Sequence, residues 1–493
     1  VYIVLVGDAP QLNPLTGIGS CASDSMFTLL EGGDLVPDVL ISRFSAADSG
    51  ELNPQLAKVL TYEQNPPIGE WLNKFAGLAS NEGSGPSDEE YSQEIEARFM
   101  VHNPDSVGDR IYQSMGHGPA EISAAANEGR FWISYFGHGS GTSWSNPNFS
   151  NSNVDSLTNG FMTPFISDVS CLNGGFDSGS DCFAERWMKG DDGAVSMFSS
   201  STSCSWHEPA TMSWGVCFSV TGDSSGSIPG GNHILGQMTL DGYLHMYDNF
   251  GTGSATEEVM NQYVLFGDCS LLFRSDVPVV PTVSHLPTTP MAPMPFEVTV
   301  TNGGSPIAGA SVCAFKAGEV HVVGVTDGSG VATLDIAPTT IGDMIVTVYG
   351  PNMVPQENIV MVAPAGCGVV VLDRTGYNCS DTVIMRVFDS DLNANPGVAE
   401  TVDVDISSDS EPTPEIVTLT ETGPDTAEFQ GSIMTSDTMG GPGYLLVSNA
   451  DTITVHYFDV DCDGSTADEY DTAGVDCQVP SISGVTVSNM GTD

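Results

Sequence analysis

The sequence predicts an α/β domain with an open, mostly parallel sheet and helices on both faces, followed by two all-β sandwich modules. Over residues 1–276, short apolar runs alternate with helix-like stretches, which is typical of a parallel sheet covered by helices. A proline-rich stretch then begins at Val277, and short strand-like runs with alternating polarity follow it. We expect domains at 1–276, 277–362 and 363–480, with residues 481–493 opening a further module or forming a linker.

The first domain is predicted to contain apolar strands that are separated by helices. The strands are continuous apolar runs, as expected where both faces of a sheet are buried. We expect strands at Val1–Val6, Asp38–Ile41, Phe131–Phe136, Pro164–Val169 and Ala194–Phe198, and helices at Asn53–Tyr62, Asp88–Phe99, Ala120–Asn127 and Cys182–Lys189.

The first β module is predicted from residues that alternate between apolar and polar, and Thr326–Gly330 is typical of a hairpin turn. The second module spans roughly residues 366–480. In the first module we expect strands at Phe296–Val300, Ala310–Phe315, Val320–Val325, Val331–Ile336 and Met344–Val348.

The chain is very acidic, with 12 Lys and Arg against 63 Asp and Glu and a formal net charge of −51 over 493 residues. This charge argues against nucleic-acid partners and anionic membranes, and no apolar run is long enough for direct membrane insertion. Between Asp381 and Asp493 the sequence contains many acidic residues and a single basic residue, Arg386. Such a surface needs salt or divalent cations to screen it, so we expect a secreted or cell-surface protein. Selection for solubility is the alternative explanation.

The first residue and the cysteines add two expectations. The chain begins at Val1 inside an apolar run, which suggests a processed or partial chain. Eleven cysteines in an exported protein would leave one reactive thiol if ten were paired. In the acidic region, the local pairs Cys367–Cys379 and Cys462–Cys477 are plausible, although sequence does not fix the connectivity.

Two motifs at strand ends carry the chemistry. His138 lies between two glycines just after one predicted strand, and Cys171 follows another. Ligands bind at the carboxyl ends of the strands in open α/β sheets, and an imidazole there can activate a thiol to attack a carbonyl. The N–H groups of Gly139 and Cys171 would hold the developing oxyanion. A core cysteine and an ordinary glycine-rich turn are the alternatives.

A set of short strings follows in order over about residues 1–275: Val4–Asp8, Ala79–Gly83, Tyr135–Trp144, Leu157–Asn159, Pro164–Phe176, Cys182–Glu185, Ser205–Trp206 and Leu265–Leu271. These strings resemble the gingipain family of cysteine peptidases, which have a caspase-like fold. The proline-rich hinge and first β module also stand where gingipains carry an immunoglobulin-like domain. The resemblance implies that the family's N-terminal catalytic subdomain is absent from this chain.

The resemblance implies roles for individual residues. Cys171 is similar to the family nucleophile, His138 to its general base and acid, and Glu82 to the acidic residue that orients the imidazole. Gly139 is similar to an oxyanion-hole donor, and catalysis requires no cofactor. A solvated loop carboxylate is the alternative for Glu82.

The residues of the primary specificity pocket match less closely. Asp88 resembles the pocket aspartate of arginine-cutting members, although it would also serve as a charge at a helix N-terminus. Trp206 resembles an aromatic of the pocket wall, while Cys204 and Ala210 depart from the family's residues. A carboxylate in the pocket would prefer Arg or Lys in the substrate.

Two acidic clusters in the C-terminal part suggest a structural calcium ion. Their Asp-x-Asp spacing is typical of calcium loops, but Tyr470 replaces the Glu that a complete helix-flanked loop would need. Solvated turns are the alternative. The candidate ligands are Asp459, Asp461 and Asp463 in one cluster and Asp389, Asp391 and Asn393 in the other.

Together these features predict a secreted or cell-surface cysteine endopeptidase of gingipain type that acts on protein or peptide substrates. Cleavage after Arg or Lys is expected if Asp88 lines the pocket. A transpeptidase is a close variant. The rival interpretation is a non-catalytic structural or adhesive protein that self-associates or attaches to the cell surface through its β modules.

Overall fold

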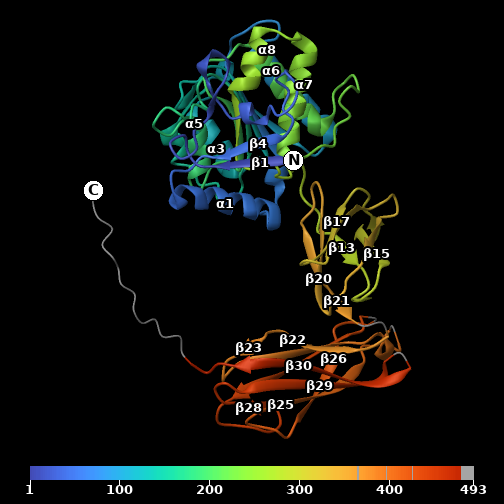
Figure 1. Ribbon diagram of the computed structural model, residues 1–493. Helices are drawn as coiled ribbons and strands as arrows, with labels where there is room; N and C mark the ends of the chain where they lie inside the picture. The colour runs from blue at the N-terminus through green and yellow to red at the C-terminus, as the bar shows by residue number, and fades with distance from the viewer. Residues whose placement is uncertain (364–365, 396, 425, 463, 479–493) are drawn as a thin grey trace. The chain divides into compact units, whose positions relative to one another are not determined.

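The computed structural model describes residues 1–363, 366–395, 397–424, 426–462 and 464–478, so the segment 481–493 and the predicted ligand Asp463 lie outside the described residues (Figure 1). The chain divides into two units. The first contains Val1–Pro281 together with Tyr349–Pro355, and the second contains Thr282–Val348 with Gln356–Asp493.

The first unit is built on an eight-stranded sheet. All neighbouring strands in it run parallel except β11 and β12, which pair antiparallel. This confirms the open, mostly parallel sheet. In spatial order the strands are β1 (Tyr2–Val6), β4 (Leu40–Phe44), β12 (Tyr263–Phe266), β11 (Ser196–Ser200), β10 (Phe165–Val169), β7 (Trp132–Phe136), β5 (Lys74–Ala79) and β6 (Val107–Tyr112).

Helices cover both faces of this sheet, as predicted. They are α1 (Ser49–Gln64), α2 (Asp88–His102), α3 (Pro119–Glu128), α4 (Asn151–Val154), α5 (Phe183–Lys189), α6 (His207–Thr221), α7 (Leu235–Phe250) and α8 (Ser254–Gln262). Two short hairpin-like pairs complete the unit: β2 (Leu15–Thr16) with β3 (Ala22–Ser23), and β8 (Ser143–Ser145) with β9 (Asn148–Ser150).

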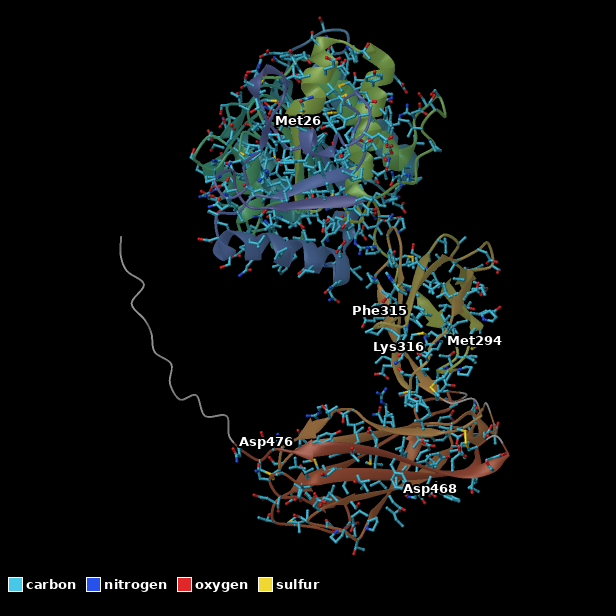
Figure 2. The ribbon with its side chains drawn as sticks, viewed as in Figure 1. Met26, Met294, Phe315, Lys316, Asp468 and Asp476 are labelled. Atoms are coloured by element: carbon cyan, nitrogen blue, oxygen red, sulfur yellow. A yellow bond between two sulfur atoms is a disulfide. The ribbon has the colours of Figure 1, made fainter. Side chains whose placement is uncertain are left out.

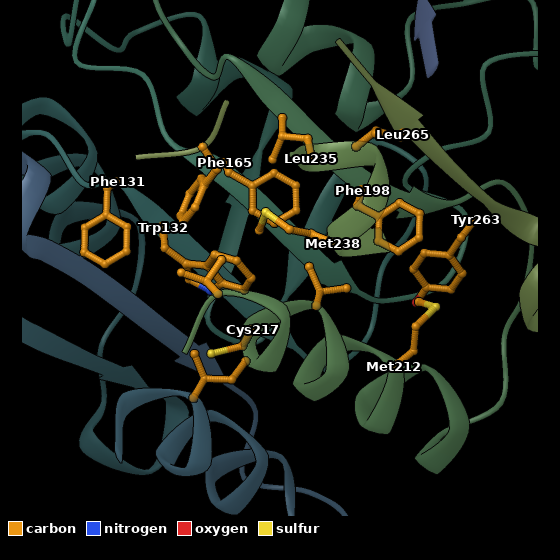
Figure 3. Packing of buried hydrophobic residues seen from close by; sticks show 14 of the residues in the cluster. Phe131, Trp132, Phe165, Phe198, Met212, Cys217, Leu235, Met238, Tyr263 and Leu265 are labelled. Atoms are coloured by element: carbon orange, nitrogen blue, oxygen red, sulfur yellow. The ribbon is translucent and has the colours of Figure 1, made fainter. Parts of the chain in front are cut away.

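Two separate cores form because side chains alternate across each strand. Trp132 and Phe165 point to one face, where they pack with residues of α2, α6 and α7 (Figure 3). Ile133 and Ile166 point to the other face and pack with residues of α3 and α5. The loops that follow β7 and β10 therefore extend from strands that are packed on both faces.

The first β module consists of two sheets. One contains β13 (Thr282–Ser284), β15 (Met294–Asn302), β16 (Ser305–Pro306) and β19 (Val331–Ile336). The other contains β14 (Thr288–Pro290), β21 (Gln356–Ala363), β20 (Gly342–Tyr349), β17 (Ser311–Lys316) and β18 (Val320–Val325). Figure 2 labels Met294, Phe315 and Lys316 on these strands.

The hairpin predicted at Thr326–Gly330 is wrong. The segment is a tight turn, in which Gly330 N donates to the Asp327 carbonyl at 3.0 Å, but the strands it joins, β18 and β19, lie in different sheets. β18 pairs with β17 instead, and β19 pairs with β15. A turn signal fixes the reversal of the chain and leaves the choice of sheet open.

The second β module is one continuous nine-stranded sheet around an apolar core that includes Val387, Ile406, Phe429 and Val455. Exposed carboxylates such as Asp468 and Asp476 lie on its surface (Figure 2). Its strands are β22 (Val369–Leu372), β23 (Gly376–Tyr377), β24 (Thr382–Phe388), β25 (Thr401–Ser408), β26 (Glu415–Glu421), β27 (Glu428–Ser436), β28 (Tyr444–Leu446), β29 (Thr452–Cys462) and β30 (Ser465–Val475).

The disulfides of this module correct the sequence interpretation. Cys379 pairs with Cys477 and Cys367 with Cys462, so the local pairs are wrong. For Cys379–Cys477 the reason is strand register: Tyr377 stands opposite Val475 in the parallel pair β23–β30, and Cys379 and Cys477 each follow their strand by two residues. The other seven cysteines are free, so four of the eleven cysteines are paired rather than ten.

None of the described helices combines the length and the apolar character that crossing a bilayer requires.

Candidate active site

Three neighbouring parallel strands, β5, β7 and β10, end in register at one edge of the sheet. Ala79, Phe136 and Val169 are direct partners across these strands. His138 and Cys171 each follow their strand by two residues, and Glu82 follows β5 by three. The sheet therefore brings together three residues that lie far apart in the sequence, at the edge where α/β sheets bind ligands.

The loop that carries His138 is shaped by its two glycines. Gly137 has φ of 155°, and a Cβ there would lie 2.7 Å from the Tyr135 hydroxyl oxygen. A Cβ on Gly139 would lie 2.3 Å from the Cys171 carbonyl oxygen. The His138 loop thus lies directly against the Cys171 loop, and Gly139 occupies a position that admits no side chain.

His138 is about half exposed and contacts an acid and an aromatic ring. Its Nε2 lies 3.0 Å from Oε2 of Glu82, and its ring stands at 73° to the Trp206 ring with centroids 5.2 Å apart. A carboxylate only accepts hydrogen bonds, so Nε2 carries a proton. In the neutral ring Nδ1 is then the nitrogen that can accept a proton.

Cys171 is half-buried, and its environment favours the thiolate. The Cys204 side chain, which hydrogen-bonds the Cys171 sulfur, lowers the pKa of the Cys171 thiol to about 6 against the opposing effect of burial. The backbone N–H of Cys204 donates to Sγ at 3.5 Å, and this bond and the nearby His138 lower the pKa further. A thiol ionised near neutral pH is a competent nucleophile.

Asp88 lines the same pocket as the cysteine and the histidine. This pocket measures about 120 Å³ and is lined by Asp88, Gly137, His138, Val169, Cys171, Cys204, Ser205 and Trp206. Asp88 is 3 % exposed, and its Oδ2 accepts a hydrogen bond from Ser80 Oγ at 2.5 Å. Burial raises the pKa of the Asp88 carboxyl to about 6, although the bond from Ser80 opposes the shift.

The helix-capping alternative for Asp88 can be compared with the bonds at the start of α2. Ser87 is the N-cap and forms a capping box with Glu90, in which each side chain accepts from the other's backbone N–H. The Asp88 side chain is engaged by Ser80 instead. The capping bonds are therefore made by Ser87 and Glu90, while the Asp88 carboxyl, although in the first turn of α2, lines the pocket.

A buried carboxylate beneath the site escaped the sequence analysis. Asp168 in β10 is fully buried and accepts from Trp144 Nε1 at 2.9 Å, Ser170 Oγ at 2.8 Å and Ser199 Oγ at 2.6 Å. Ser170 in turn accepts from Asn173, whose Oδ1 binds Gly141 N. This network ties the Cys171 loop to the His138 loop, and an Asp inside a largely apolar predicted strand was the available signal.

The predicted calcium ligands lie in the second β module. Asp389 and Asp459 are both buried beside Gly368, whose N–H donates to Asp459 Oδ2 at 2.7 Å. Asp389 accepts from Asp391 N, and Asp459 accepts from Asp461 N. The two clusters predicted separately are thus adjacent at Asp389 and Asp459.

Of the three potential metal-ligand atoms that lie close together, only that of Asp459 belongs to a predicted cluster. Among the described residues, Cys367, Asp459 and Cys462 are the group whose potential ligand atoms lie within 4.8 Å of one another, and the two cysteines form a disulfide. Asn393 belongs to the loop that follows Asp391.

The model of peptidase family C25 matches residues 1–274. Gingipain R2 of Porphyromonas gingivalis is 28% identical over 386 residues, which cover 76% of this chain and 50% of that protein. Lys-gingipain of the same species is 24% identical over 72% of this chain and 21% of its own length. This chain therefore spans half or less of these two relatives.

Two solved structures that are similar to this chain are also gingipains. A crystal structure of the Arg-specific cysteine proteinase gingipain R superposes with a TM-score of 0.67 and 27% identity, covering 74% of this chain and 84% of that one. Another structure, a complex of the pro- and mature domains of Porphyromonas gingivalis RgpB, gives a TM-score of 0.66 over 74% of this chain and 86% of that one.

Proposed function

The chain belongs to peptidase family C25, the gingipain family of cysteine peptidases, and on this premise we propose that it cuts protein or peptide substrates as an endopeptidase through Cys171 and His138. The observation that carries the proposal is the common register of β5, β7 and β10, whose ends bear Glu82, His138 and Cys171. The low pKa of the Cys171 thiol supports it.

In the proposed mechanism the Cys171 thiolate attacks the carbonyl carbon of the scissile peptide bond. The N–H groups of Gly139 and Cys171 stabilise the oxyanion, and protonated His138 gives its proton to the leaving amine. Glu82 keeps a proton on Nε2, which leaves Nδ1 for this transfer. Water, deprotonated by His138, then hydrolyses the thioester and regenerates the thiolate.

We propose that the substrate residue before the cleaved bond is Arg or Lys. The buried carboxyl of Asp88 lines the pocket beside Cys171, and a cation is the ligand that satisfies a buried carboxylate. The indole of Trp206 forms one wall, where it packs against the backbone of Gly83. The printed names of the relatives, Arg-specific and Lys-gingipain, favour the same substrate class.

We propose an oxidising location, secreted or at the cell surface. Two disulfides join distant segments of the second β module, and such bonds persist mainly outside the cytosol. The net charge of −51 favours a medium that contains salt or divalent cations.

We also propose that calcium binds at the acidic cluster of the second β module. Asp389 and Asp459 are buried side by side, and burial together with the charge of Asp459 raises the pKa of Asp389. Carboxylate oxygens are the ligands that calcium takes, and a cation there would relieve the repulsion between the two acids. Calcium has no role in the proposed chemistry.

A digest of a peptide library tests the proposed activity. Cys171→Ala and His138→Ala should each lower kcat/KM by about three orders of magnitude or more, because each removes a reacting group. Cys313→Ala and His117→Ala are matched controls, since both residues lie away from the pocket, and they should cleave like the wild type. Circular dichroism should show the same fold for all four variants.

Full activity of either Cys171→Ala or His138→Ala would contradict the peptidase mechanism. Absence of cleavage by the wild type under reducing conditions would favour the non-catalytic alternative. Addition of a free amine separates hydrolysis from transpeptidation, because a transpeptidase would yield the amide product at the expense of the acid.

A further inference from the structure

The pocket contains a second thiol next to the nucleophile. Cys204 and Cys171 line the same pocket, and Cys204 N–H donates to Cys171 Sγ at 3.5 Å. Cys171 Sγ in turn lies 3.9 Å from the Cys204 carbonyl oxygen, to which its thiol can donate. The Cys171 sulfur is therefore in direct contact with Cys204, and neither cysteine forms a disulfide.

Backbone contacts fix this arrangement. Leu172 N donates to the Thr202 carbonyl at 3.0 Å, and Gly174 N donates to the Ser200 carbonyl at 2.8 Å. These two bonds hold the loop after β10 next to the segment that follows β11. Cys204 reaches Cys171 through this pairing, so the two cysteines stay close without movement of either strand.

We propose that Cys204 is a resolving cysteine, which forms a disulfide with Cys171 when a hydroperoxide oxidises the nucleophile and so switches the site off reversibly. This inference rests on the proposed function, because it concerns the regulation of the same site.

The chemistry requires a hydroperoxide as the oxidant. The Cys171 thiolate attacks one peroxide oxygen, the O–O bond breaks, and a sulfenic acid and hydroxide form; the hydroxide takes a proton from solvent. The Cys204 sulfur then attacks the Cys171 sulfur, and the S–O bond breaks. The Cys204 proton leaves with the displaced hydroxide as water. Each disulfide therefore consumes one peroxide, and a dithiol reductant returns both thiols.

The surroundings of Cys204 suit this order of events. The hydrogen bond with Cys171, burial and the negative charge of Cys171 together raise the pKa of the Cys204 thiol, so it stays protonated beside the thiolate. Conversion of Cys171 to a neutral sulfenic acid removes that charge. Cys204 then ionises more readily at the moment when its attack is needed.

Most of the other free thiols are shielded from this reaction. Cys21, Cys182, Cys217 and Cys269 are buried in the first unit. Cys313 is half-buried in β17 of the first β module and serves as the matched control.

The test is mass spectrometry of the full chain after exposure to hydrogen peroxide without reductant. The wild type should lose the mass of two hydrogen atoms. Trypsin cuts after Arg186 and Lys189, so a peptide containing Cys171 should be found joined to one containing Cys204. Dithiothreitol should then restore cleavage almost fully.

Cys204→Ser keeps a hydrogen-bond donor but cannot form the disulfide. After the same treatment it should carry two or three added oxygen atoms on Cys171 and regain less than about one tenth of its own untreated activity. Cys313→Ser should behave like the wild type. The inference is overturned if the wild type shows oxygen addition on Cys171 with no joined peptide, or if Cys204→Ser recovers as fully as the wild type.

The mass measurement does not depend on cleavage, so it separates this inference from the proposed function. A joined peptide in a chain that cleaves no substrate would support the disulfide and contradict the peptidase. Cleavage without a joined peptide would do the reverse.

Discussion

The ionisation of Cys171 is the property of the site that a single titration can test. The pKa of its thiol is lowered to about 6, chiefly by the hydrogen bond from the Cys204 side chain, with further contributions from the Cys204 N–H and from His138. Because only the thiolate reacts with iodoacetamide, the alkylation rate should rise with pH through a midpoint near 6 and then level off.

The midpoint is a better measure than the absolute rate. At pH 7 a thiol with a pKa of about 6 is roughly 90% ionised, whereas an ordinary thiol near 8.5 is about 3% ionised, a roughly 30-fold difference. A less basic thiolate is also a weaker nucleophile, and with a Brønsted coefficient of about 0.45 the loss over 2.5 pKa units is roughly tenfold. The net advantage at pH 7 is therefore only about threefold, while the midpoint itself moves by more than two pH units.

The assay is pulsed alkylation over a range from about pH 4 to about pH 10 at equal protein concentration, followed by peptide mapping. Cys313 is an internal control, because burial raises the pKa of its thiol and its labelling should begin only at high pH. Cys204→Ala should move the Cys171 midpoint upward, since it removes the strongest stabilising contact. A Cys171 midpoint above about 8 in the wild type would refute the reasoning.

Three further predictions concern specificity, folding and metal binding. Asp88→Asn should reduce the preference for Arg or Lys substrates, measured by kcat/KM, by about 2–5 kcal/mol. An unchanged preference would contradict a role of Asp88 in specificity. Lys58→Met should lower the free energy of unfolding by about 1–3 kcal/mol or more, because the buried Nζ donates to the carbonyls of Met188 and Gly190. Lys74→Met, at a partly exposed ion pair, is the control and should change it by less than about 1 kcal/mol. At fixed ionic strength a chelator should lower the melting temperature of the full chain, because calcium at a hundredfold excess over Kd would stabilise the folded chain by about 2.7 kcal/mol. Asp461→Ala should abolish this effect of the chelator. Identical melting curves with and without chelator would refute the site.

Part of the central sheet could be predicted: β7 and β10, which are largely apolar, were expected within one residue of their observed bounds, whereas β5 and β12 were not predicted. β7 and β10 are buried along their whole length, and the sequence shows this directly. β6 was missed because it lies at the edge of the sheet and contains Asp109 and Arg110. Helix α6 was missed for the opposite reason: most of its surface is buried, so it lacks the polar face that produces a helical periodicity.

The position of the site could be predicted, but its lateral contacts could not. His138 and Cys171 follow strands that the sequence identifies, and parallel strands end at one edge. Cys204 reaches Cys171 only because the chain after β11 pairs with the loop after β10. The disulfide Cys379–Cys477 depends in the same way on the pairing of β23 with β30. Sequence reports the elements along the chain, whereas these contacts follow from the order and register of strands in a sheet.

For Asp88 the two physical interpretations predict opposite shifts of the carboxyl pKa. A carboxylate that serves the N-terminus of a helix is stabilised by backbone N–H groups and by the helix dipole, so its pKa falls. At Asp88 the pKa is instead raised to about 6, chiefly by burial. The carboxylate is therefore present above pH 6 and is lost as the pH falls below it, over the same range in which Cys171 loses its charge. A basic side chain bound in the pocket would lower the pKa of Asp88 and hold it ionised, so the substrate itself would complete the charge that recognises it.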